Sequence, residues 1–144
     1  MNPQKVYVLF LLPSVLSVLV IFSAPYLTYT GHTFLSNQCY HAFSSLCHQR
    51  PERSLFMWGY PLAVCARCTF LYLGILVGMI LYPLRFGKGI PLRVVLLFAA
   101  PMVVDGFSQL LFRESSNEIR ALSGFLLGVV IPFYLMPKFF KSLR

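Results

Sequence analysis

Three short stretches of the sequence hold most of the side chains that could do chemistry. They are residues 47–54 (Cys-His-Gln-Arg-Pro-Glu-Arg-Ser), residues 65–68 (Cys-Ala-Arg-Cys) and residues 105–120, which include Asp105, Gln109, Glu114 and Arg120. Thiolates, imidazoles and carboxylates bind metals, exchange disulfides or transfer protons, and guanidinium groups bind anions. We therefore expect the three stretches to form one polar site.

The cysteines allow three kinds of chemistry. The first is a metal site, because Cys47 or His48 together with Cys65 and Cys68 would offer the nitrogen and sulfur ligands that zinc prefers. The second is thiol–disulfide exchange at the C-x-x-C pair, with Cys39 or Cys47 as exchange partner and a membrane quinone as electron acceptor. The third is a structural disulfide. Our leading expectation is zinc, with Cys47, His48, Cys65 and Cys68 as the candidate ligands.

Carboxylate, amide and arginine side chains would serve such a metal site in two ways. Three residues would orient the ligands or transfer protons, namely Asp105, Gln109 and Glu114. Arginines form an outer basic cluster that could bind a lipid headgroup, namely Arg50, Arg53, Arg67 and Arg120, and the last three are the expected contacts to an anionic group. The alternative is that the arginines only pair with nearby acids, as Arg67 could with Asp105 inside the membrane.

The number of metal ligands decides the function that we expect. If one coordination position stays open, the metal could activate water and hydrolyse a lipid-linked substrate. If four protein ligands close the site, the metal is structural, and the protein is a non-catalytic scaffold or a subunit that binds a partner. A thiol–disulfide oxidoreductase that uses Cys65 and Cys68 is the rival hypothesis.

The composition places these residues in a membrane. Hydrophobic residues make up 58% of the 144 residues, charged residues only 11%, and the mean hydropathy is +0.73. A soluble domain carries roughly 25% charged residues. The net charge of +8 does not indicate a nucleic-acid partner, because the basic residues form no stripe and match no nucleic-acid-binding motif. The lipid bilayer is therefore the expected partner.

Four apolar segments are long enough to cross a bilayer, which takes about 20 residues. They cover approximately residues 6–26, 60–82, 91–112 and 119–136. We therefore predict an all-α fold, a four-helix transmembrane bundle in a single domain of residues 1–144. A long outer loop, residues 27–59, joins the first two helices, and its aromatic residues predict that it folds back onto the bundle. Ser115 and Glu118 fit a capping box that would begin the fourth helix.

Basic residues predict the orientation of the bundle. With the N-terminus in the cytoplasm, seven basic residues and no acid lie on the cytoplasmic side, namely Lys5, Arg85, Lys88, Arg93, Lys138, Lys141 and Arg144. The other five basic residues lie on the opposite side, so the positive-inside rule favours both termini in the cytoplasm. The polar site is then expected to face outside.

Helix geometry predicts that the site lies near the outer bilayer surface. Asp105 lies about 21 Å along a helix from Pro91, in the outer third of a hydrocarbon core about 30 Å thick. Cys65 and Cys68 are expected one to two turns inside the second helix. Asp105 and Gln109, at i and i+4, share one helix face, and Cys65 and Cys68 share another at i and i+3.

Two glycine motifs predict close helix packing. Residues 74–78 in the second segment and residues 124–128 in the fourth both read G-x-x-x-G. Such glycines let helix backbones approach closely in lipid. We expect an intramolecular contact between these two helices, with homo-oligomerisation through the same motifs as the alternative.

The chain resembles a domain-of-unknown-function family of small prokaryotic multi-pass membrane proteins. The elements that carry the resemblance are Cys47-His48-Gln49, Arg53-Ser54, Cys65-Ala66-Arg67-Cys68, Asp105-Gly106, Gln109, Glu114-Ser115, Asn117 and Arg120. The family often continues its Cys-Ala-Arg-Cys with Thr-Gly, where this chain has Thr69-Phe70. The resemblance implies a shared site over residues 47–128 and a place in the cytoplasmic membrane of a prokaryote. It implies no particular reaction.

In layout the chain also resembles the quinone-linked disulfide-forming membrane proteins. Those proteins have four helices, an outward-facing C-x-x-C at a helix end and further cysteines in a loop. Here only Cys39 and Cys47 could form the second pair. This likeness concerns architecture and supports the oxidoreductase hypothesis by analogy alone.

Overall fold

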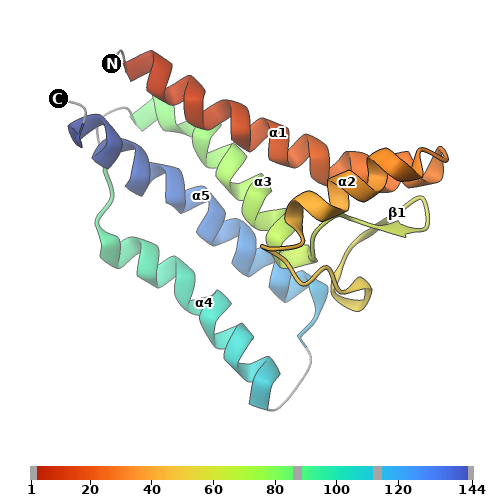
Figure 1. Cartoon of the computed structure of the whole chain (residues 1–144). Helices are drawn as coiled ribbons and strands as arrows, with labels where there is room; N and C mark the ends of the chain where they lie inside the picture. Colours follow the sequence, from red (N-terminus) through yellow and green to blue (C-terminus); the bar gives the residue numbers. More distant parts are fainter. Residues whose placement is uncertain (1–2, 86–88, 112–114, 143–144) are drawn as a thin grey trace.

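Four long helices form the framework of the computed structural model, which describes residues 3–85, 89–111 and 115–142. They are α1 (Pro3–Tyr29), α3 (Ala66–Leu81), α4 (Leu92–Leu111) and α5 (Asn117–Ser142). All four are long and apolar enough to cross a membrane. The predicted all-α, four-helix membrane bundle is therefore confirmed. Both ends of the chain lie at one end of the bundle, and α2 and the β-strands lie at the other, here called the loop end (Figure 1).

The second membrane helix begins later than the sequence predicted. It starts at Ala66 rather than near residue 60, because a short antiparallel hairpin precedes it, made of β1 (Phe56–Met57) and β2 (Tyr60–Pro61). Trp58 and Gly59 have φ angles of 53° and 82°. Positive φ at both central residues is what a two-residue hairpin turn of type I′ requires. The hairpin and the residues after it therefore take the place of the first turns of the expected helix.

The two cysteines of the C-x-x-C motif consequently lie at the start of α3. Cys65 is the N-cap residue, with extended backbone, and Cys68 lies in the first turn. The N–H of Thr69 donates to the carbonyl of Cys65 at 2.9 Å, which starts the helix. The predicted depth of one to two turns was wrong, because the hairpin occupies the residues that would have formed those turns.

The connection between α1 and α3 is folded rather than an open loop. It holds helix α2 (Thr33–Phe43), the 3-10 helix η1 (Pro51–Arg53) and the hairpin, and it reaches beyond the predicted bounds of 27–59. Gly31, with a φ of 83°, lets the chain turn from α1 into α2. The hydroxyl of Ser36 then donates to the carbonyl of Ala24 at 2.9 Å. This segment therefore folds back onto α1, as the sequence predicted.

A small apolar core fixes this folded connection to the bundle. Its buried members come from α1, α2 and the residues before α3, and they include Ile21, Ala24, Phe43, Leu62 and Val64. Burying an aliphatic or aromatic side chain stabilises a water-facing segment by roughly 1.5–3 kcal/mol. The connection is thus held by packing at both of its ends, and the residues between them have defined positions.

α3 and α5 pack backbone against backbone through the two glycine motifs. A Cβ placed on Gly128 would lie 3.0 Å from the Cα of Gly74, and a Cβ on Gly78 would lie 3.0 Å from the ring of Pro132. Contacts this close leave no room for a side chain at these glycine positions. The predicted intramolecular contact is therefore confirmed, whereas homo-oligomerisation stays a prediction.

The last membrane helix begins at a different serine from the one predicted. The N–H of Ile119 donates to Oγ of Ser116 at 3.4 Å, and α5 starts at Asn117. Ser115 is buried, and its own hydroxyl donates to the carbonyl of Ser116. The capping box of Ser115 with Glu118 predicted that Ser115 caps the helix. Because α5 starts at Asn117, the capping residue is instead Ser116.

Gly128→Ala tests the close contact between α3 and α5. The added methyl group would meet the α3 backbone. We expect the free energy of unfolding to fall by about 1–3 kcal/mol, the usual effect of overpacking. Gly106→Ala is the matched control, because its Cβ would lie 3.8 Å from its nearest neighbour, Nη1 of Arg67. Unfolding in mixed detergent micelles measures both variants, and equal losses would contradict the packing account.

Candidate functional site

Three cysteine sulfurs meet at the loop end of the bundle. The Sγ atoms of Cys47, Cys65 and Cys68 all lie within 4.8 Å of one another. Cys47 follows α2, where its N–H donates to the carbonyl of Phe43 at 2.9 Å, and it is buried. The N–H of Cys65 donates to Sγ of Cys47 at 3.3 Å. Two separate segments of the chain therefore build one group of three thiols, here called the sulfur cluster.

Hydrogen bonds within the sulfur cluster favour one ionised sulfur. The thiols of Cys65 and Cys68 donate to Cys47, which lowers the pKa of Cys47 well below its usual value. The same bond to Cys47 raises the pKa of Cys65. A thiolate that accepts hydrogen bonds from its neighbours is also the form that binds a metal.

Gln49 holds the loop that carries Cys47. Its Nε2 donates to the carbonyls of Tyr40 and Ala63, at 2.5 and 2.8 Å, and so ties the loop to α2 and to the residues before α3. Its backbone has a φ of 48°, a conformation that non-glycine residues rarely adopt. In the sequence, Gln49 stands out only as a member of the stretch 47–54 and of the family motif. Its place between His48 and Arg50 was the one available signal, and its positioning role was not predicted.

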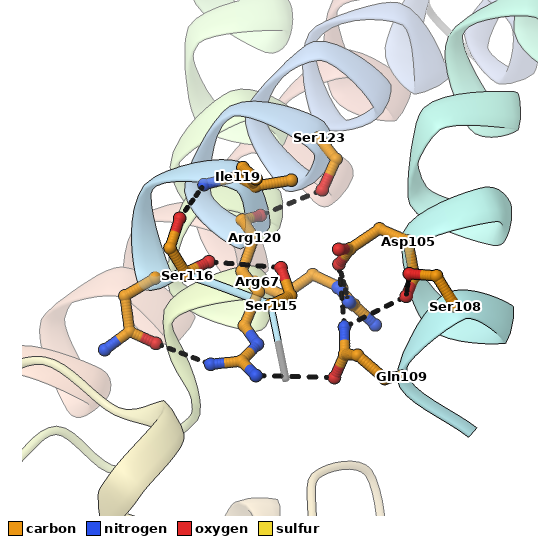
Figure 2. A network of polar contacts seen from close by, with 10 residues as sticks. Arg67, Asp105, Ser108, Gln109, Ser115, Ser116, Ile119, Arg120 and Ser123 are labelled. Carbon is orange, nitrogen blue, oxygen red and sulfur yellow. Dashed lines mark hydrogen bonds and ion pairs between the residues drawn. The ribbon is translucent and has the colours of Figure 1, made fainter. Parts of the chain in front are cut away.

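A chain of polar side chains joins α3, α4 and α5 (Figure 2). Arg67 of α3 forms an ion pair with Oδ2 of Asp105 on α4. Gln109 donates to the same oxygen at 2.8 Å and accepts from Arg120 of α5 at 3.4 Å. Asp105 and Arg120 are only 5% and 3% exposed. Buried charges of this kind are stabilised only when they are paired and hydrogen-bonded.

The network continues from α5 to the loop. Nη1 of Arg120 donates to Oδ1 of Asn117 at 2.9 Å, and the amide of Asn117 donates to the carbonyl of Ser54 at 3.5 Å. Ser54 is buried, and its hydroxyl donates to the carbonyl of Arg50 at 2.9 Å. Residues 50–54 are therefore held over the helix ends, and their arginines face the same region as the sulfur cluster.

A cavity of about 240 Å³ lies between the sulfur cluster and the arginines. The three cysteines of the cluster line it, together with His48, Gln109 and four arginines, namely Arg50, Arg53, Arg67 and Arg120. No carboxylate is among the described residues that line it. The cavity therefore joins thiol ligands and positive charge in one space.

The predicted site residues fall into three groups. Cys47, Cys65 and Cys68 form the sulfur cluster, whereas His48 lines the cavity outside that cluster. The predicted arginines and Gln109 also line the cavity, as does Arg50 of the same basic cluster. Asp105 is bonded to Arg67 and Gln109 instead of lining the cavity. Glu114 lies outside the described residues.

Four membrane-length helices with a cysteine cluster at one end define a small multi-pass membrane protein. The chain belongs to the family described as "Predicted membrane protein (DUF2085)", whose model matches residues 47–134. That range contains the sulfur cluster, the polar network and all the residues that line the cavity except Leu46. The resemblance stated from the motifs is therefore confirmed.

Two archaeal proteins are similar to this chain. An uncharacterized protein of Methanocaldococcus jannaschii is 43% identical over 152 aligned positions, which cover 97% of this chain and 96% of that protein. An uncharacterized protein of Methanothermobacter thermautotrophicus is 36% identical over 91 positions, which cover 60% of this chain and 81% of that protein. No solved structure matches the chain. The similarity to the first protein thus covers nearly the whole chain, including the residues before 47 that the family model does not match.

Asp105→Asn tests whether the ion pair with Arg67 holds α4 in place. The substitution leaves Arg67 without its carboxylate in a largely buried position. Removing one partner of a buried pair typically costs about 3–5 kcal/mol. We expect a loss of that order in unfolding free energy in mixed micelles, and none for the control Glu118→Gln, whose side chain is exposed. If both variants lost the same amount, the pair would not hold α4.

Proposed function

We propose that the sulfur cluster binds one zinc ion. The observation that carries this proposal is the convergence of three Sγ atoms within 4.8 Å of one another. Thiolates 2.3 Å from a tetrahedral zinc lie about 3.8 Å apart, so a small inward movement completes the site. The hydrogen-bonded sulfur of Cys47 supplies the first thiolate, and metal binding displaces the remaining thiol protons.

Three protein ligands would leave the fourth zinc position facing the cavity. Structural zinc sites close with four protein ligands, whereas catalytic sites keep three and one open position. At an open position zinc lowers the pKa of bound water to about 7 and so supplies Lewis-acid chemistry. His48 lines the same cavity outside the sulfur cluster, in a place to accept or donate a proton. This arrangement favours a catalytic centre over the structural metal of a non-catalytic scaffold.

The reaction that fits this site best is hydrolysis of an anionic, lipid-linked substrate. Four arginines surround the cavity and would hold an anionic group next to the metal. Gln109 lines the cavity, and Asp105 orients Arg67 through their ion pair. In this proposal Asp105 and Gln109 position the arginines, and His48 takes the proton-transfer role.

The charge distribution supports a site that faces outside. The described acids Glu52, Asp105 and Glu118 belong to the loop end. The other end holds five described basic residues, whereas the loop end holds four. They are Arg50, Arg53, Arg67 and Arg120 at the loop end, and Lys5, Arg85, Arg93, Lys138 and Lys141 at the other end. By the positive-inside rule this second end is cytoplasmic, which leaves the cavity on the outer face of a prokaryotic cytoplasmic membrane.

Thiol–disulfide exchange is the second candidate function. Cys65 and Cys68 form a C-x-x-C at a helix N-terminus, and Cys47 lies within reach as a third thiol. Such an arrangement could pass a disulfide between the pair and the third cysteine, with a quinone as the electron acceptor. This function requires metal-free cysteines that oxidise reversibly.

Zinc content separates the two functions. We expect about one zinc per chain in protein purified in detergent, because one trithiolate site binds one ion. Cys47→Ser, Cys65→Ser and Cys68→Ser should each lose it, whereas Cys39→Ser should keep it because Cys39 lies outside the sulfur cluster. His48→Ala should also keep the metal. The measurement is elemental mass spectrometry with thiols counted on the same sample; metal-free protein with a Cys65–Cys68 disulfide would instead support the oxidoreductase.

Reporter fusions test the orientation. A fluorescent protein attached after the last residue should fold and fluoresce, and alkaline phosphatase at the same place should be inactive, because this end is expected in the cytoplasm. Alkaline phosphatase inserted at Ser44, an exposed loop-end position, should be active. The reverse pattern at both positions would place the cavity in the cytoplasm.

A further inference from the structure

A second cavity joins the arginines to the lipid-facing side of α4. It has a volume of about 550 Å³ and is lined by His48, Arg50, Arg53 and Arg67 together with Val103 and Phe107. Val103 and Phe107 are 52% and 62% exposed on a helix that is apolar enough to span a membrane. The two cavities share the arginines Arg50, Arg53 and Arg67. The two neighbouring cavities, here together called the path, therefore extend from exposed apolar side chains of α4 to the arginines next to the sulfur cluster.

The chemistry of this path changes along its length. At α4 it is apolar, as a lipid chain requires, and further in it is lined by guanidinium groups without a carboxylate among its described lining residues. Arginine binds phosphate oxygens with two parallel hydrogen bonds, and that contact is strongest away from water. A lipid has an apolar chain at one end and a phosphate at the other, and these match the apolar and the arginine-lined parts of the path.

Arg67 can contact such a phosphate without leaving Asp105. It uses Nη2 for the ion pair. Its Nε is buried and has no hydrogen-bond partner among the described residues. Gly106 leaves space next to Nη1, where a Cβ would come no closer than 3.8 Å. Nη2 thus serves the carboxylate, Nε keeps an unmet donor, and Arg67 lines the second cavity.

We propose that the arginine-lined cavities bind the phosphate group of a membrane lipid that enters sideways past α4. Arg50 and Arg67 hold the phosphate, and Val103 and Phe107 contact the acyl chain. This proposal rests on the proposed function for the substrate class. It adds the headgroup that binds and the route by which the lipid enters. Binding itself depends on the arginines and not on the metal.

The test is binding of tail-labelled phosphatidic acid to the full-length protein in detergent, followed by fluorescence anisotropy. Arg50 is exposed, so Arg50→Gln should fold as the parent does. We expect this variant to bind about tenfold more weakly, as the loss of one charged hydrogen bond predicts. The matched control is Arg93→Gln, the same change at the start of α4 on the opposite end of the bundle, and it should leave the affinity unchanged.

Competition distinguishes a lipid site from a free-anion site. Unlabelled phosphatidic acid should displace the probe, whereas phosphatidylcholine and inorganic phosphate at the same concentration should not. Equal affinity in Arg50→Gln and Arg93→Gln, or equal displacement by either competitor, would overturn the proposal. Zinc counted on the same samples keeps the two claims separate, because metal without lipid binding overturns this inference alone, and lipid binding without metal overturns the zinc site alone.

Discussion

The close contact between α3 and α5 is the constraint on which the site depends. Gly124 and Gly128 let α5 lie directly on the α3 backbone, and a Cβ on Gly124 would lie 3.2 Å from the carbonyl carbon of Arg67. That contact fixes the first turn of α3, which carries both Arg67 and Cys68. From this position Arg67 reaches Asp105 on α4, a helix that is otherwise little buried. In lipid, where apolar burial gives little preference, such polar links and close contacts decide how helices are arranged.

The connection between α1 and α3 brings the third cysteine, Cys47, to the sulfur cluster by other interactions. Here the chain leaves the helices, so its backbone groups need partners that helices do not provide. Gln49 satisfies the carbonyls of Tyr40 and Ala63, while Phe43 and Leu62 bury the segment against α1. Cys47 is thereby placed next to a helix start that carries the other two cysteines. The sulfur cluster thus depends on two kinds of packing. The contact between α3 and α5 positions Cys65 and Cys68, and the small apolar core between α1 and the following connection positions Cys47.

The sequence was informative where one strong signal determines structure. Apolar length predicted the four helices, and the G-x-x-x-G motifs predicted the α3–α5 contact. The start of α3 was missed because Trp58 and Gly59 adopt positive φ angles that periodicity does not reveal. The grouping of Cys47 with Cys65 and Cys68 could be suspected from ligand types, but the position of His48 outside the sulfur cluster could not, because it depends on how the loop after α2 folds. Likewise, the cavity is a product of three helices and a loop.

In the proposed function, three cysteine sulfurs share one metal ion whose fourth position opens to the arginine-lined cavity. X-ray absorption at the zinc edge, on protein purified with its native metal, tests this claim most directly. We expect the zinc to have three sulfur neighbours at about 2.3 Å and one lighter neighbour, oxygen or nitrogen, at about 2.0–2.1 Å. Four sulfur neighbours, or a shell of nitrogen and oxygen alone, would contradict it.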